Sequence, residues 1–243
     1  RRGGEVGPGQ ERFARTLINQ GLVHPRWVPH PDLTDVDVVI PVLDDTAGLV
    51  RLLNTLRGLS VTVVDDGSRN PTSVADVCSH FGARLVQLNV NIGPAGARNA
   101  GLEATTQPFV CFIDSDVQIE SAASTLAALR GVCEDPLVGA VAPRVRGATG
   151  HGPRAHFEHS SGALDLGARR GLAVPGGHVP YLPSACLMVR RDAVGDGFDE
   201  TLRCGEDVDL VWRLSDAGWL VRYEPSIEVA HPARTSWVKW IRQ

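Results

Sequence analysis

Aspartates follow three apolar stretches of the chain, each at the point where a buried strand would end. The stretches VIPVLDD, VTVVDDG and VCFIDSD end in Asp44 and Asp45, Asp65 and Asp66, and Asp114 and Asp116. In doubly wound sheets, ligands bind beyond the carboxyl ends of the strands. Acids gathered at that edge repel one another unless a divalent metal or an arginine lies among them. The pattern therefore predicts an anionic ligand held through a cation.

The spacing of Asp114 and Asp116 refines this prediction. Residues i and i+2 of an extended chain point to the same side. The two carboxylates can address one ligand together, one taking a metal ion and the other a nearby hydroxyl. Any single pair of this kind is equally typical of a turn, because aspartate bonds its neighbouring backbone. Three such clusters at corresponding strand ends favour a shared site.

The elements that position these acids alternate between strand and helix. Continuous apolar runs predict strands buried on both faces, and the spacing of the leucines in 46–59 predicts an amphipathic helix. The expected strands are 36–42, 61–67, 83–89 and 108–114, and the expected helices are 46–59, 71–81, 93–105 and 121–132. This alternation predicts an α/β fold with a mostly parallel, doubly wound sheet.

The second half reads as a smaller, mixed part of the same domain. We expect strands at 138–147 and 181–191, a helix at 205–218, and two short strands within 219–232. Residues 148–180 show no sustained periodicity, which is typical of a functional loop and predicts a lid. The expected organisation is a loosely structured N-terminal arm (1–35), a first half of the domain (36–137), a second half (138–232) and a C-terminal amphipathic segment (233–243).

Composition excludes several function classes. The net charge of −4 and pI near 6.1 come without a basic stripe, so we expect no nucleic-acid partner. Lys239 is the one lysine, which argues against Schiff-base chemistry. The five cysteines form no CxxC pair, so free thiols in a reducing compartment, the cytoplasm, are expected.

We found no apolar run of about 18 residues. The chain lacks an initiator methionine and stops in the amphipathic WVKWIRQ, so we expect a fragment of a longer protein. Contact with the inner face of a membrane is then expected only through segments outside this chain.

Five motifs in fixed order carry a family resemblance. PVLDD, VVDDGS, GPAGARNAG, FIDSD and GEDVDLVWRL together resemble the family 2 glycosyltransferases over about residues 36–231. The resemblance implies the GT-A fold and a nucleotide-sugar donor, commonly a UDP-sugar. It makes 36–137 the nucleotide-sugar-binding half and 138–232 the acceptor-binding and catalytic half. PYLPSACLMVRR and YEPSIEVAHPARTSW resemble the branch that serves the mycofactocin system. That branch implies transfer of glucose from UDP-glucose to a hydroxyl of a peptide-derived redox cofactor, with inversion.

The resemblance also assigns roles on the donor side. Asp66 accepts the uracil N3–H, beside a base pocket formed by Pro41, Val42 and Asp44. Asp65 either shares that role or caps the following turn. Arg98 contacts the nucleotide or its phosphates; the plainer alternative is an exposed helix arginine. Asp114 contacts the ribose, and Asp116 and His231 hold Mn²⁺ or Mg²⁺.

On the acceptor side, the GEDVDL motif supplies the catalytic residue. Asp207 is the expected general base and Glu206 an expected substrate contact. Both residues also suit a helix N-terminus, where acids offset the helix dipole. We expect Asp207 to keep a low pKa there.

Two other interpretations remain open at this stage. FIDSDV also matches the DxD of haloacid-dehalogenase-type phosphatases, although those need a downstream lysine and Lys239 is terminal. A non-catalytic nucleotide-sugar-binding module would keep Asp66 and Asp116 without using Asp207. The four histidines of 148–180 fit no zinc spacing, and GPAGARNAG does not fit the dinucleotide-binding GxGxxG.

Overall fold

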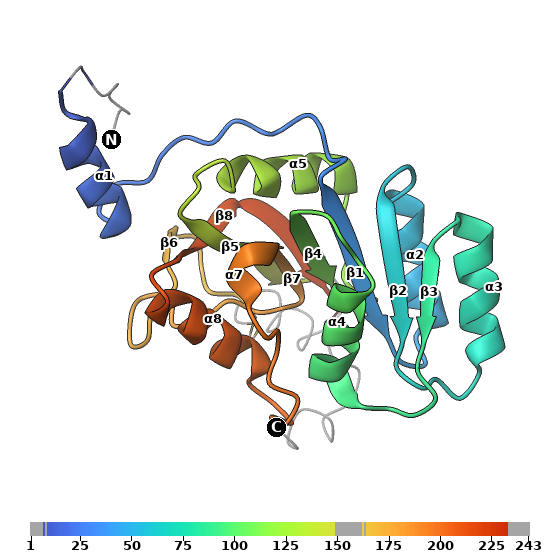
Figure 1. Cartoon of the computed structure of the whole chain (residues 1–243). Helices are drawn as coiled ribbons and strands as arrows, with labels where there is room; N and C mark the ends of the chain where they lie inside the picture. Colours follow the sequence, from blue (N-terminus) through green and yellow to red (C-terminus); the bar gives the residue numbers. More distant parts are fainter. Residues whose placement is uncertain (1–6, 8, 149–161, 163, 233–243) are drawn as a thin grey trace.

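A single eight-stranded sheet runs through the molecule (Figure 1). The computed structural model describes residues 7, 9–148, 162 and 164–232. The strand order is β3-β2-β1-β4-β7-β5-β8-β6. The strands are β1 (Val36–Val42), β2 (Ser60–Asp65), β3 (Arg84–Gln87), β4 (Phe109–Ile113), β5 (Val138–Gly147), β6 (Gly171–Leu172), β7 (Cys186–Arg190) and β8 (Leu220–His231).

The sheet is mixed but mostly parallel. Strands β3, β2, β1 and β4 pair in parallel, as do β5 and β8, whereas β7 runs antiparallel between β4 and β5 and β6 antiparallel to β8. Both halves of the chain therefore contribute to one sheet. The predicted α/β class and doubly wound parallel half are confirmed.

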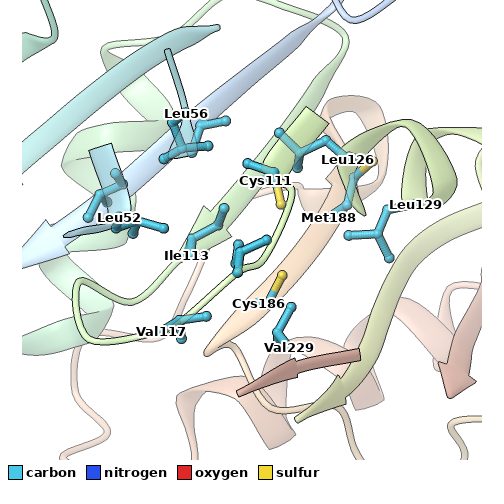
Figure 2. Packing of buried hydrophobic residues seen from close by; sticks show 14 of the residues in the cluster. Leu52, Leu56, Cys111, Ile113, Val117, Leu126, Leu129, Cys186, Met188 and Val229 are labelled. Atoms are coloured by element: carbon cyan, nitrogen blue, oxygen red, sulfur yellow. The ribbon is translucent and has the colours of Figure 1, made fainter. Parts of the chain in front are cut away.

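Helices cover both faces of the sheet. They are α1 (Glu11–Asn19), α2 (Thr46–Thr55), α3 (Pro71–Phe81), α4 (Gly93–Glu103), α5 (Ala122–Val132), α7 (Arg191–Val194) and α8 (Glu206–Asp216). One buried cluster joins α2, α3 and α5 to the first face, and a second joins α4, α7 and α8 to the other. Figure 2 shows part of the first cluster, where Cys111, Cys186 and Met188 pack near Leu126 and Leu129.

Local signals explain where several elements begin and end. Asn70 caps α3 by accepting from the Ser73 N–H, and Gly82 ends that helix in the left-handed region at φ 69°. Gly101 of GPAGARNAG serves packing: a Cβ there would lie 2.2 Å from Cγ1 of Val39. Helix α4 thus lies close against β1, which brings Arg98 to the edge of the sheet.

Four sequence-based expectations about elements were wrong. Residues 219–232 form one strand, β8, because its register against β5 shifts between Pro143 and Arg144 and absorbs the segment containing Pro225. The arm contains helix α1, and 46–59 is helical only to Thr55. Residues 171–179 pair through β6 and an Ala173–Val179 bridge. The expected lid lies largely outside the described residues, as do His151, His156, His159 and the segment 233–243.

All five cysteines lie in the described ranges and are free thiols. Cys78, Cys111, Cys133 and Cys186 are buried, whereas Cys204 is exposed. Burial raises the pKa of Cys78 to about 11 and that of Cys133 to about 12. Among the described helices, none is long and apolar enough to cross a membrane.

Candidate active site

A cavity of about 400 Å³ opens at the carboxyl ends of β1, β2 and β4. Seven residues singled out in the sequence line it: Pro41, Val42, Asp66, Arg98, Asp114, Asp116 and His231. Asp45, one of the strand-end acids but given no separate role, also lines it, and sequence reasoning missed Asn91, Pro94 and Ser115. The acids at the three strand ends do converge, and their separate roles stay predictions.

Asp44 lies outside the set of cavity-lining residues. Its backbone has φ 56°, and its carboxylate accepts from the Arg69 backbone N–H at 2.8 Å and from the Arg69 Nε at 2.7 Å. Both bonds lower the pKa of Asp44, and the bond from the Arg69 backbone N–H has the larger effect. Asp45 faces the cavity instead: one oxygen caps α2 through the Gly48 N–H, and the other lies 3.3 Å from the Ser115 hydroxyl. The base-pocket role expected of Asp44 therefore does not match its position.

The two acids after β2 differ in their surroundings. Asp65 is fully buried and accepts from the Ser68 N–H at 3.0 Å, which is the turn-capping alternative. Asp66 lines the cavity and accepts from the backbone N–H groups of Ile92 at 2.8 Å and Gly93 at 3.1 Å. Burial raises the pKa of Asp66, and these bonds only partly offset that effect. The bonds fix the Asp66 carboxylate against the loop before α4.

Asp116, which follows β4, forms a pair with His231, the last residue of β8. Nε2 of His231 lies 3.3 Å from Oδ1 of Asp116, and Nδ1 lies 3.1 Å from the Pro232 carbonyl oxygen. A carbonyl only accepts, so Nδ1 carries the proton. In the neutral ring, Nε2 would then present a lone pair to a carboxylate oxygen. A proton or a metal ion between them relieves that repulsion.

Each member of this pair shifts the pKa of the other: the pKa of His231 is raised and that of Asp116 is lowered. Burial works to lower the pKa of His231, but the hydrogen bond and charge of Asp116 outweigh the effect of burial, so the pKa is raised. Burial works to raise the pKa of Asp116, and the same His231 interactions lower it. Each group thus favours the charged form of the other.

The donor set at this pair fits Mn²⁺ or Mg²⁺. Mg²⁺ is usually held by one or two carboxylates together with substrate phosphates and waters. Asp116 would supply a carboxylate oxygen and His231 the Nε2 lone pair, with Nδ1–H held by a carbonyl as in many metal-bound histidines. Within the described part of the chain, no group of three or more potential metal ligands occurs. The fit therefore depends on ligand oxygens from the substrate.

Arg98 joins the cavity to the GEDVDL motif. Its guanidinium lies 2.7 Å from Oδ1 of Asp114 and 2.9 Å from Oε1 of Glu206. Arg98 is only 3% exposed, so the exposed-arginine alternative is wrong. Burial works to lower the pKa of Arg98, but Asp114 and Glu206 raise it overall. Glu206 is therefore placed as the partner of Arg98.

We expect Arg98→Met to lower the free energy of unfolding by about 3 kcal/mol, because it leaves two carboxylates without their buried partner. Urea denaturation measures this loss. Arg69→Met is the matched control, since its ion pair with Asp44 is largely exposed and should contribute much less to stability. Equal losses in the two variants would contradict a structural role for the buried bridge.

Asp207 is the second residue of α8 and follows Glu206. Its carboxylate accepts from the Val208 N–H at 2.8 Å and the Ser184 N–H at 3.3 Å. Burial, and then the charge of Glu206, raise the pKa of Asp207, so the expected low value was wrong. Desolvation outweighs the helix N-terminus here. A carboxylate with a raised pKa is a stronger base and suits proton abstraction.

The acids at the strand ends, set on this sheet order, define a GT-A nucleotide-sugar transferase fold. The chain belongs to glycosyl transferase family 2, whose sequence profile matches residues 37–198. It is 45% identical over 94% of its length to the pre-mycofactocin glycosyltransferase of Mycobacterium tuberculosis H37Rv, of which it covers 49%. It is 30% identical to that organism's N-acetylglucosaminyl-diphospho-decaprenol L-rhamnosyltransferase, over 74% of this chain and 68% of that protein (strain CDC 1551 / Oshkosh).

Solved structures share the fold at low sequence identity. The mannosyltransferase PcManGT of Pyrobaculum calidifontis, in complex with GDP-Man and Mn²⁺, has a TM-score of 0.65 at 19% identity, covering 95% of this chain and 66% of that one. S. aureus TarS 1–349 in complex with UDP-GlcNAc has a TM-score of 0.63 at 20% identity, covering 83% and 59%.

Family membership decides between the glycosyltransferase and phosphatase interpretations of the sequence. The phosphatase interpretation of FIDSDV is wrong, because the motif lies inside a glycosyltransferase family 2 domain. The chain spans about half the length of the pre-mycofactocin glycosyltransferases that it matches.

Proposed function

We propose that this chain binds a UDP-sugar with Mn²⁺ or Mg²⁺ and transfers the sugar, glucose, to an acceptor hydroxyl with inversion. The observation that carries the proposal is one connected site. Asp116 and His231 lie at a cavity with Asp66 and Asp114, and Arg98 links that cavity to Glu206 beside Asp207. Such a site can bind a nucleotide at one end and offers a catalytic general base, Asp207, at the other.

On the donor side, each residue has a task that its position allows. The Asp66 carboxylate, fixed by two backbone bonds, keeps lone pairs that can accept the uracil N3–H. Asp114, oriented by Arg98, bonds a ribose hydroxyl. When bound, Mn²⁺ or Mg²⁺ neutralises the diphosphate and acts as a Lewis acid on the leaving group. Asp116 and His231 are the residues that would hold it.

On the acceptor side, Asp207 takes the proton of the attacking hydroxyl. The hydroxyl oxygen forms a bond to the anomeric carbon from the face opposite the diphosphate. The bond from that carbon to the diphosphate breaks, and the electron pair leaves with UDP. One displacement needs one base and inverts the configuration.

The acceptor follows from the relatives rather than from the cavity. The pre-mycofactocin glycosyltransferases are the relatives with 45% identity, so we infer that the acceptor is a peptide-derived redox cofactor or its precursor. The TarS complex with UDP-GlcNAc supports a uridine nucleotide, whereas PcManGT holds GDP-Man. The identity of the donor's nucleobase is therefore the first property to test.

We expect calorimetric titration to give tighter binding of UDP than of GDP or dTDP. UDP binding should be at least roughly tenfold tighter with Mn²⁺ present, because Asp116 and His231 would hold a cation that neutralises the diphosphate. UDP-glucose consumption with a hydroxyl acceptor, followed by NMR of the anomeric proton, should show a β-linked product. Preference for GDP or dTDP would overturn the uracil assignment. Donor binding without any transfer would favour a binding module.

A further inference from the structure

A second cavity, of about 330 Å³, lies away from the donor site. The arm covers it with Arg26, Trp27 and Pro29, α5 provides Ala128 and Val132, and Arg170 and the middle of β8 complete it. No residue lines both cavities. The arm is held in place here, because the His30 N–H donates to the Ala127 carbonyl at 2.8 Å and Trp27 packs on the core.

Positive charge gathers around this cavity. Arg26 and Arg170 line it, and Arg222 lies behind the lining residues: its guanidinium is 5.3 Å from the Trp27 ring centroid and interacts electrostatically with Glu224 and Arg170. The one carboxylate among the lining residues is Glu224, which Arg170 and the Ser226 hydroxyl already bond at 2.9 Å and 2.7 Å. Asp135, whose charge works to raise the pKa of Arg222 more than that of Glu224 does, is paired with Arg15 at 2.7 Å. Two lining arginines and the neighbouring Arg222 therefore lie near a single lining carboxylate.

Arg222 shows that this charge is not balanced within the described part of the chain. It is only 3% exposed, yet its Nε and Nη2 atoms have no hydrogen-bond partner there. Buried donors without a partner cost free energy, and native structures keep few of them. Burial also lowers the pKa of Arg222. A negative charge arriving in the cavity would stabilise this arginine.

The walls indicate what kind of anion fits. Trp27, Pro29, Val132 and Ile227 give the cavity an apolar lining beside Arg26 and Arg170. Guanidinium groups bind carboxylates through paired hydrogen bonds, and a volume near 330 Å³ suits a small organic molecule. We propose that this cavity is a second ligand site, which takes a small carboxylate with an aromatic or aliphatic body. This proposal is independent of the glycosyl transfer described above.

Phenylacetate is a suitable probe, with phenylacetamide as its uncharged counterpart. We expect phenylacetate to bind the protein while UDP and Mn²⁺ are saturating, and to shift the Trp27 indole N–H resonance. That resonance can be assigned with Trp27→Phe. Phenylacetamide should bind at least roughly tenfold more weakly, because it lacks the charge. Equal binding of the two probes, displacement by UDP, or binding of inorganic phosphate in place of phenylacetate would overturn the proposal.

Two variants test the arginines. Arg26 is exposed and forms no ion pair with a described residue, so Arg26→Gln should leave the melting temperature unchanged and weaken phenylacetate binding about tenfold. Arg222→Met should also weaken binding without lowering the melting temperature, since it removes an unsatisfied buried charge. Arg57→Gln, which alters another arginine stacked on a ring, should change neither. Unchanged binding in both test variants would refute the site.

Discussion

Replacing Asp116 by Asn should reduce kcat/KM for sugar transfer roughly 10³-fold, because the variant loses the carboxylate proposed to hold the metal at the diphosphate. The fold should persist, since the Asp116 side chain is 38% exposed and its one ion-pair partner among the described residues is His231. Calorimetry should show that Mn²⁺ no longer tightens UDP binding, while metal-free UDP binding is unchanged.

His231→Gln and Asp76→Asn complete this experiment. The first removes the other proposed metal ligand and should produce the same loss of metal-dependent binding. Asp76 is an exposed acid on α3, so its variant should keep full activity. Activity of Asp116→Asn within tenfold of the parent, with metal dependence retained, would remove Asp116 from the proposed site.

Replacing Asp207 by Asn should reduce transfer about 10³-fold while donor binding is retained, because the variant lacks the base but keeps the cavity. In the parent, the acid limb of the kcat/KM profile should lie above pH 3.8, since burial raises the pKa of Asp207. A steady-state pH series measures this limb. Asp209→Asn is the matched control, because Asp209 lies in the same helical turn but pairs with Arg213 at 2.7 Å.

Stability separates a catalytic role for Asp207 from a structural one. Because its pKa is raised in the folded state, the unfolding free energy falls as pH rises from about 3.8 through the folded value. Asp207→Asn removes that loss, so at neutral pH the variant should be at least as stable as the parent. A variant that is both less stable and unable to bind UDP would show that Asp207 supports the fold instead.

The strand ends were predictable because their signals are local. Apolar runs ending in aspartates located β1, β2 and β4, and Asn70 and Gly82 marked the ends of α3. The choice between Asp44 and Asp45 was not predictable, because a single left-handed residue at Asp44 turns its side chain toward Arg69. Neighbouring residues in a turn carry no pattern that reveals this.

Features that depend on distant packing also escaped the sequence. The Arg98–Glu206 bridge joins residues 108 positions apart, and nothing in either motif indicates that they meet. The raised pKa of Asp207 follows from burial, which the helix N-terminus alone did not predict. The continuity of β8 depends on its pairing with β5, whereas the proline in its middle suggested a break.

The distribution of the thiols makes this protein convenient to label. Four cysteines are shielded within the interior, and the fifth, Cys204, is accessible two positions before α8 begins. A maleimide fluorophore should therefore attach at one place without any engineered substitution. Because that place adjoins the acceptor-side helix, the dye would report in real time when a molecule arrives beside Asp207.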